Sequence, residues 1–133
     1  MSDYNVPGNL KYYKEHEWIK ILADNSVVIG ISDYAQQTLT DVTYVEFKVK
    51  IGATVTAGDI VGEIESVKSV SDVYIPISGK ILETNEEILE EDPELVNSSP
   101  YDKGWFFKLE PSNSEEIKAL MDADQYQTYI ASL

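Results

Sequence analysis

The chain contains no cysteine, and all ten of its basic residues are lysines, so it has no arginine either. Without cysteine it can form neither disulfide bonds nor a catalytic thiolate. Without arginine it lacks the planar group that binds phosphate or carboxylate through two parallel hydrogen bonds. The single histidine, His16, rules out a histidine-based metal cluster and a Cys/His pair. Most of the side-chain sets used by self-contained enzymes are therefore absent.

Long apolar runs are also missing, because none approaches the ~18 residues that cross a membrane. The first six residues are acidic and lack both a basic patch and an apolar stretch, so we expect neither a secretory signal nor a transit peptide as the chain stands. We therefore expect a cytoplasmic protein of bacterial type, or a mitochondrial matrix protein from which a transit peptide has been removed.

The net charge is −14, whereas a nucleic-acid binder needs a cationic surface. We expect a monomer with no nucleic-acid or membrane partner. The charge either maintains solubility or steers the protein onto partners with basic surfaces.

The 133 residues, 43% of them hydrophobic, predict one domain over residues 1–133, with a core at about 11–110 and C-terminal helices at 112–131. Strand-like runs are expected at 18–22, 27–31, 42–49 and 105–109, with a turn at Asp24-Asn25-Ser26. Many short strands with a few peripheral short helices predict a mostly β (α+β) fold of the barrel-sandwich hybrid type.

Five helix starts are predicted from capping chemistry. The expected first residues or caps are Ser32, Thr84, Asp92, Ser112 and Asp122. The helix after Ser32 should run to Leu39 and bury Tyr34, Ala35 and Leu39. The helix after Ser112 should turn Ile117, Leu120 and Met121 inward, and the last helix carries Tyr126, Tyr129 and Ile130.

Lys68 lies between two strand-like runs, at 60–67 and 73–77, whose apolar residues alternate with period two. This pattern predicts a β-hairpin with the lysine at its polar tip, where a modifying enzyme can reach the amine. The alternative is ordinary, because exposed lysines at turns are common. Pro76 confines the second strand to a sheet edge or ends it.

Motifs for other chemistry are weak or missing. The sequence has no Gly-x-Ser-x-Gly elbow, no Gly-x-Gly-x-x-Gly and no Walker loop. His16 could act as a general base or could pack and hydrogen-bond locally. The acidic segment 83–94 lacks the spacing and central glycine of a calcium-binding EF-hand loop, so a solvated acidic face is the favoured interpretation.

Several motifs together resemble one family. Glu65 to Gly79 closely resembles the lipoylation segment of the H proteins of the glycine cleavage system. Three further segments are similar to that family, namely Lys14 to Trp18, Gly30 to Gln36, and Pro93 to Tyr101 with Gly104-Trp105. The resemblance covers about residues 11–130 in the same order. The chain departs from the family pattern at Thr40, where a glycine is common, and at Ser69 to Ser71.

The resemblance implies that Lys68 carries lipoate in amide linkage as a swinging arm and that the protein is a carrier rather than an enzyme. The expected partners are glycine decarboxylase (P protein), which loads the aminomethyl group of glycine, the aminomethyltransferase (T protein), dihydrolipoyl dehydrogenase (L protein) and lipoylating enzymes. Such proteins serve glycine catabolism and one-carbon metabolism.

The resemblance also assigns roles near the arm. Glu17 and Asp72 would pair with the ammonium of the loaded arm in a water-excluding cleft, and His16 would line the same region. Glu65 would be recognised by the lipoylating enzyme. Four alternatives stay open: a biotin carrier, a lipoyl domain of a 2-oxoacid dehydrogenase, an H-like lipoyl relay that donates lipoate to other proteins, and a non-catalytic interaction module. Biotinyl lysines typically lie between methionines, whereas Val67 and Ser69 flank Lys68.

Overall fold

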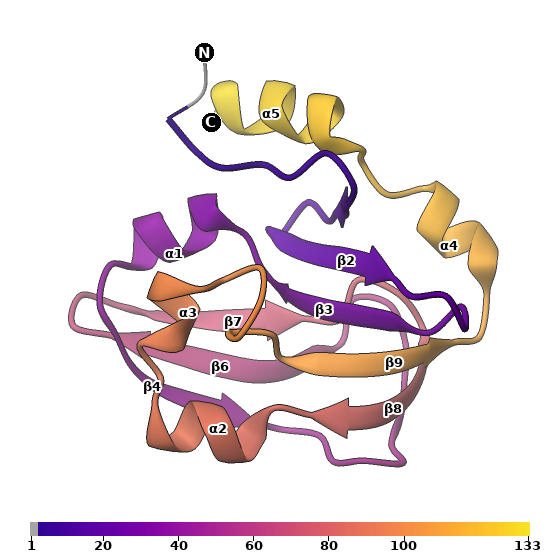
Figure 1. Cartoon of the computed structure of the whole chain (residues 1–133), viewed down its shortest axis with the longest axis horizontal. Coiled ribbons are helices and arrows are strands. Elements are labelled where there is room, and N and C mark those ends of the chain that lie inside the picture. The colour runs from indigo at the N-terminus through magenta and orange to yellow at the C-terminus, as the bar shows by residue number, and fades with distance from the viewer. Residues whose placement is uncertain (1–2) are drawn as a thin grey trace.

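The computed structural model describes residues 3–133 as two antiparallel sheets flanked by short helices (Figure 1). The six-stranded sheet has the order β1 (Lys11–Tyr12), β2 (Glu17–Ile21), β3 (Val27–Ile31), β9 (Phe107–Pro111), β8 (Gly79–Thr84) and β5 (Thr54–Val55). The three-stranded sheet has the order β4 (Val42–Phe47), β6 (Ile60–Ser66) and β7 (Val70–Tyr74). The helices are α1 (Asp33–Leu39), α2 (Glu86–Glu91), α3 (Leu95–Ser98), α4 (Ser114–Lys118) and α5 (Ala123–Ala131).

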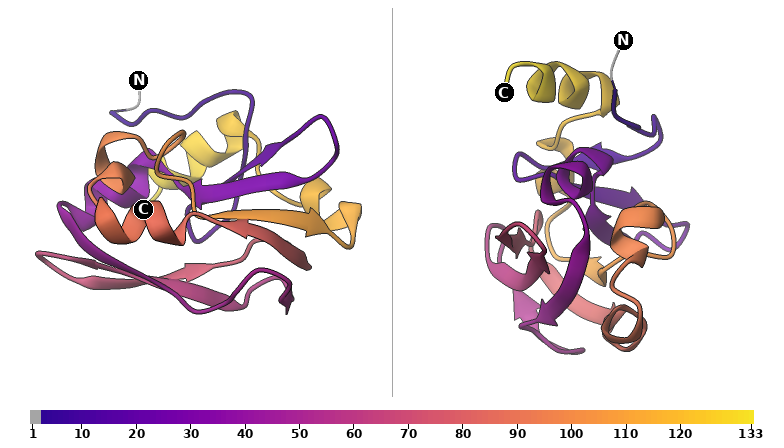
Figure 2. Two further views of the ribbon diagram at one scale, coloured as in Figure 1. Left: turned by 60° about the horizontal axis from the view of Figure 1, so that its bottom comes forward. Right: turned by 90° about the vertical axis from the view of Figure 1, so that its left-hand side faces the viewer.

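The two sheets form separate layers that enclose the main core (Figure 2). Alternate residues of each strand point into it, as the period-two pattern requires. Ile29 and Leu109 come from the six-stranded sheet, and Ile64 and Val73 from the three-stranded one; all four are fully or almost fully buried. The predicted mostly β fold with peripheral short helices is confirmed, and the arrangement is consistent with a barrel-sandwich.

A second, smaller core lies outside the six-stranded sheet, where α5 covers the N-terminal segment (Figure 1). Tyr12, Trp18 and Tyr126 are its largest buried side chains. The Trp18 ring lies flat against Gly30, the facing residue on β3, where an added Cβ would come within 2.6 Å of a ring carbon. This packing places α5 over the start of β2, close to the predicted site residues.

Several local predictions are confirmed. The β2–β3 hairpin turns at Asp24-Asn25-Ser26, with Asn25 at φ 70°. Ser32 caps α1 by accepting a hydrogen bond from the Ala35 N–H, and Asp122 caps α5 through a complete capping box. The edge strand β7 ends two residues before Pro76.

The other three predicted helix starts are wrong by one or two residues. The N-cap residues are Asn85, Glu94 and Asn113 in place of Thr84, Asp92 and Ser112. At Thr84 and Ser112 the reason is strand pairing, which extends further than the capping pattern indicated. Thr84 is still paired with Phe107 in β8, and the Ser112 N–H donates to the Ser78 carbonyl.

Some predicted element ends also differ. Val49 lies beyond β4, Trp105 precedes β9, and Leu120 and Met121 follow α4 instead of lying within it. Tyr34 and Ala35 are only partly buried, whereas Leu39 is buried as expected. The short strands β1 and β5 were not predicted, because two residues carry too little periodicity to detect.

Thr40, which ends α1, adopts φ 63° and ψ −150°, a backbone region populated almost only by glycine. We expect Thr40→Gly to raise the free energy of unfolding by about 1 kcal/mol, because it relieves the strain of a β-branched residue there. Chemical denaturation of the two proteins measures the difference. Thr38→Gly, in the interior of the same helix, is the matched control and should destabilise the protein. If Thr40→Gly is no more stable than the wild-type protein, the backbone at Thr40 is not strained.

Candidate functional site

Lys68 lies in the loop of the β6–β7 hairpin, which forms the left-hand end of the molecule in Figure 1. Hydrogen bonds of Ser66 organise the tip. The Ser66 hydroxyl oxygen accepts from the backbone N–H groups of Lys68 (3.2 Å) and Ser69 (3.0 Å), and the Ser66 N–H donates to the Ser69 carbonyl (2.8 Å). The Val67 N–H donates to the Asp41 carbonyl at 3.0 Å, which ties the tip to the segment after α1.

The Lys68 side chain is exposed at this tip, as predicted. Its Nζ donates to the Thr38 carbonyl at 3.4 Å, so the amine lies over the C-terminal end of α1. Val67 and Val70 flank it and are 69% and 58% exposed. Two exposed valines thus flank the lysine in the chain at the hairpin tip.

Glu17 is the most unusual ionisable residue near this hairpin. It begins β2 and is only 1% exposed. Its Oε2 accepts a hydrogen bond from the Tyr74 N–H at 2.9 Å, whereas Oε1 has no hydrogen-bond partner among residues 3–133. Burial raises the pKa of Glu17 well above its ordinary value. A buried carboxylate oxygen without a partner is costly for stability and is available to a cationic ligand.

Other acidic and phenolic groups surround Glu17. Asp72 and Tyr74 share one face of β7, and Tyr74 binds Glu17 through its backbone. Burial and the nearby Asp72, Glu15 and Glu17 carboxylates raise the pKa of Tyr74. Burial followed by Glu17 and Glu15 does the same for the pKa of Tyr13. The structure therefore brings Glu17 and Asp72 to the same region, with Glu15 as a third carboxylate.

The length of β7 sets how far a group on Lys68 must extend to reach the carboxylates near Tyr74. From Val70 to Tyr74 the strand rises about 13 Å. An extended arm that prolongs the lysine side chain is comparable in length, so a group at its end could reach the Asp72 and Glu17 carboxylates. A positively charged group there would gain charge-assisted hydrogen bonds.

Comparison with known proteins identifies the family. The profile of the family described as "Glycine cleavage H-protein" matches residues 10–133. The probable glycine cleavage system H protein of Thermococcus gammatolerans is 51% identical, covering 100% of this chain and 98% of its own. The glycine cleavage system H protein of Chromobacterium violaceum is 48% identical, covering 96% and 98%. The chain belongs to the glycine cleavage H-protein family.

The fold agrees with this family. The crystal structure of a glycine cleavage system H protein from Mycobacterium marinum superposes with a TM-score of 0.85 at 34% identity, covering 95% of this chain and 99% of that one. As a family member, the protein is a lipoyl-carrier component of the glycine cleavage system, not an enzyme in its own right. Its partners are accordingly the other proteins of that system.

The remaining predicted site residues lie elsewhere. His16 packs beneath α5, where its Nδ1 lies 2.9 Å from the Tyr126 hydroxyl, and its ring contacts Tyr34 and Tyr129. Burial lowers the pKa of His16. The His16 ring therefore faces α5, and Glu15, one of the carboxylates near Tyr74, also interacts with it electrostatically. Glu65 is exposed at the end of β6, opposite Val70 in the hairpin and three residues before Lys68.

Sequence reasoning missed Tyr74, Tyr13 and Glu15 as neighbours of Glu17. The alternation of β7 could have placed Tyr74 on the face of Asp72. The contact with Glu17 could not have been found, because it joins strands of different sheets. Among residues 3–133, no group of His, Asp and Glu side chains is arranged to hold a metal ion, and no helix is long and apolar enough to span a membrane.

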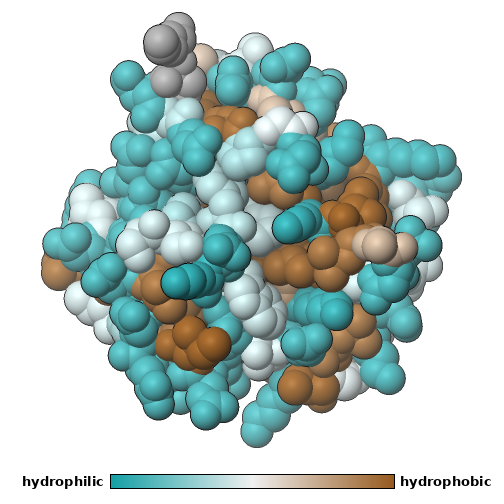
Figure 3. Space-filling view, in the orientation of Figure 1, coloured by the Kyte–Doolittle hydropathy of each residue, from teal (hydrophilic) through white to brown (hydrophobic). Residues whose placement is uncertain are grey.

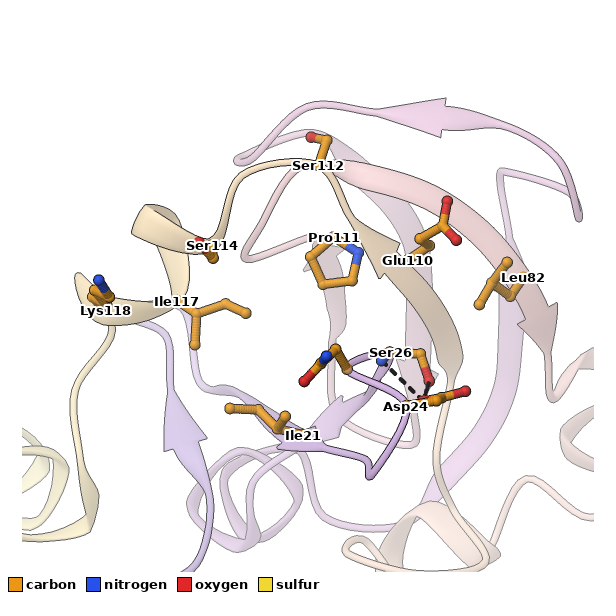
Figure 4. A pocket seen from close by; sticks show the side chains of 11 residues that line it. Ile21, Asp24, Ser26, Leu82, Glu110, Pro111, Ser112, Ser114, Ile117 and Lys118 are labelled. Atoms are coloured by element: carbon orange, nitrogen blue, oxygen red, sulfur yellow. Dashed lines mark hydrogen bonds between the residues drawn. The ribbon is translucent and has the colours of Figure 1, made fainter.

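A large cavity lies away from Lys68. It has a volume of about 740 Å³ and lies between the β2–β3 turn, the end of β9 and α4 (Figure 4). These elements are at the opposite end of the molecule from the β6–β7 loop (Figure 1). Its apolar walls are Ile21, Leu82, Pro111 and Ile117. The face shown in Figure 3 is largely hydrophilic, and most of its apolar residues lie on the right-hand side of the view. The cavity is separate from the charged groups around Glu17 and takes no part in the site described above.

Proposed function

We propose that Lys68 carries lipoate in amide linkage and that the carrier shuttles the aminomethyl group of glycine on this arm. The observation that carries the proposal is the combination of an exposed lysine at the hydrogen-bonded tip of the β6–β7 hairpin with the buried Glu17 carboxylate, which has one unpartnered oxygen among residues 3–133 and lies beside the other end of the same hairpin. Family membership supports it. When bound, the lipoyl group supplies the sulfur chemistry that accepts and releases the aminomethyl group.

The residues of this chain fit a loaded arm. Glu17 Oε1 is buried without a partner among residues 3–133, and the ammonium of the cargo would satisfy it. Asp72 would contribute a second carboxylate from the neighbouring strand. Pairing with a cation would lower the raised pKa of Glu17, so loading would release a proton whenever Glu17 is protonated beforehand. The role of both residues is to hold the ammonium away from water.

The hairpin tip is proposed as the contact surface for the enzymes that visit the arm. These are glycine decarboxylase, the aminomethyltransferase, dihydrolipoyl dehydrogenase and a lipoylating enzyme. Exposed Val67 and Val70 would enter apolar recesses of such partners, and Glu65 would meet basic residues at the rim. The net charge of −14 favours partners whose docking faces are basic.

Exchange of labelled bicarbonate into the carboxyl group of glycine tests the shuttle role. We expect the lipoylated protein to support exchange by glycine decarboxylase from the same organism, at a rate that saturates with carrier concentration. Unlipoylated protein is the matched control and should give the background rate. An equally low rate with the lipoylated protein would contradict the shuttle role and would favour the relay, in which the arm is donated to other proteins.

A further inference from the structure

The turn between β1 and β2 determines where Glu17 lies, and it contains a strained residue. His16 has φ 80°, a left-handed conformation that is uncommon for residues other than glycine and that asparagine, aspartate and histidine adopt more often than the rest. The His16 N–H donates to the Tyr13 carbonyl, and the Tyr13 N–H donates to the Glu17 carbonyl, both at 2.9 Å. Because of this turn, the adjacent side chains of His16 and Glu17 reach different surroundings, one beneath α5 and the other beside β7.

A buried hydrogen-bond network holds this turn from the side of α5. The Tyr126 hydroxyl lies 2.9 Å from His16 Nδ1 and 2.7 Å from Ser32 Oγ. A phenol has a single proton, so Tyr126 donates at most one of these bonds and accepts the rest. The Ser32 N–H in turn donates to the His16 carbonyl at 2.9 Å. His16 is thus fixed through both its ring and its backbone.

Packing fixes Tyr126 itself. Its ring stacks on Tyr12 with centroids 4.5 Å apart and planes 5° from parallel, and both side chains are fully buried. Ser32 is also fully buried, and its hydroxyl caps α1. The network therefore connects three elements distant in sequence: the turn before β2, the start of α1 and the C-terminal helix.

We propose that Tyr126 is a positioning residue: through His16 and Ser32 it holds the strained turn, which keeps the Glu17 carboxylate buried beside Tyr74 with one oxygen available to a cation. The inference rests on the proposed function for its consequence, because that cation is the ammonium of the loaded arm. The C-terminal helix thereby contributes to the arm site without touching it. Strained residues persist where surrounding contacts hold them in place, and those contacts are present here.

Tyr126→Phe tests the proposal, since it keeps the stacked ring and removes both hydrogen bonds of the hydroxyl. We expect the Glu17 carboxyl to move toward solvent, so that its titration midpoint shifts toward the ordinary glutamate value by about one pH unit. Carbon-13 NMR of labelled glutamate side chains measures this in the unlipoylated protein, with Glu17→Gln identifying the signal. Glu15 and the phenols of Tyr13 and Tyr74 interact with Glu17, Asp72 interacts with Tyr74, and all four are unchanged in the variant. The Tyr126 phenol also interacts with Glu17, but burial raises its pKa, so it is neutral where Glu17 titrates and its removal takes away no charge.

Tyr101→Phe is the matched control. It also removes a hydroxyl with two hydrogen bonds, to the Asn5 carbonyl and from the Asp33 N–H, but none to His16 or its turn. Its Glu17 midpoint should stay at the wild-type value. In lipoylated protein loaded with aminomethyl groups, Tyr126→Phe should release ammonia about tenfold faster, and Tyr101→Phe at the wild-type rate.

A Tyr126→Phe protein that melts at a lower temperature with an unchanged Glu17 midpoint would overturn the positioning role. If this variant does not fold, His16→Asn replaces it, because asparagine tolerates positive φ but cannot make the same ring contacts; the same shift is expected, and an unchanged midpoint overturns the proposal. The NMR measurement needs no arm. A wild-type protein that takes no arm would therefore overturn the proposed function and leave the positioning of Glu17 to be judged by its midpoint.

Discussion

Replacing Lys68 by arginine is expected to reduce carrier-dependent glycine–bicarbonate exchange to the rate measured without the protein. Arginine keeps the positive charge and can still donate to the Thr38 carbonyl. Its guanidinium is always protonated and lacks the nucleophilic amine that a lipoylating enzyme must acylate. The prediction thus separates the chemistry of the amine from its charge. The fold should be unaffected, because the Lys68 side chain is exposed.

Lys80→Arg is the matched control for this prediction. Lys80 is also exposed and lies on β8, after the same hairpin, but in the other sheet. Its variant should support exchange at the wild-type rate after lipoylation. Residual exchange above background with Lys68→Arg would mean that another lysine carries the arm, and it would remove Lys68 from the centre of the account.

Glu17→Gln should make the unloaded protein more stable and the loaded arm less durable. The amide keeps an oxygen that can accept from the Tyr74 N–H and removes a buried charge whose second oxygen has no partner among residues 3–133. We expect the free energy of unfolding at pH 8 to rise by about 1 kcal/mol. Loss of a charge-assisted hydrogen bond to the cargo, worth about 1.5–3 kcal/mol, should speed ammonia release from the loaded arm by about tenfold or more.

The stability difference should depend on pH in a definite direction. Because burial raises the pKa of Glu17 in the folded state, the folded protein binds more protons than the unfolded chain between the two pKa values. The loss of unfolding free energy caused by the buried Glu17 carboxylate is therefore complete above the raised pKa. It disappears as the pH falls toward 4.5, the ordinary pKa of glutamate. Urea unfolding of both proteins across this interval measures it. If the difference in unfolding free energy between the two proteins does not change with pH, or if Glu17→Gln releases ammonia at the wild-type rate, Glu17 does not have the proposed role.

The sequence predicted the lysine hairpin well because its signal is local. Alternating apolar residues fix which side chains point inward, and a polar tip between two such runs leaves Lys68 outside. Ser32 and Asp122 were equally predictable as caps, since a cap depends on residues three positions away. The family resemblance rested on several such segments in one order, and the two carboxylates it singled out, Glu17 and Asp72, both interact with Tyr74.

What the sequence could not predict depends on contacts between distant segments. The sequence near Thr84 and Ser112 does not show that both residues hydrogen-bond or pair with other strands, so that the helices begin only after them. The family resemblance implied that His16 lines the arm region. The turn at φ 80° and the contact of its ring with the Tyr126 hydroxyl, 110 residues away in the chain, could not be read from the sequence.

The central claim is that Lys68 is the attachment point for lipoate, and intact-protein mass spectrometry tests it most directly. Wild-type protein from a host that makes and transfers lipoate should carry a single lipoyl adduct, and fragmentation should place that adduct on Lys68. Lys68→Arg from the same host should have its unmodified mass. An unmodified wild-type protein, or an adduct that persists in Lys68→Arg, would contradict the account.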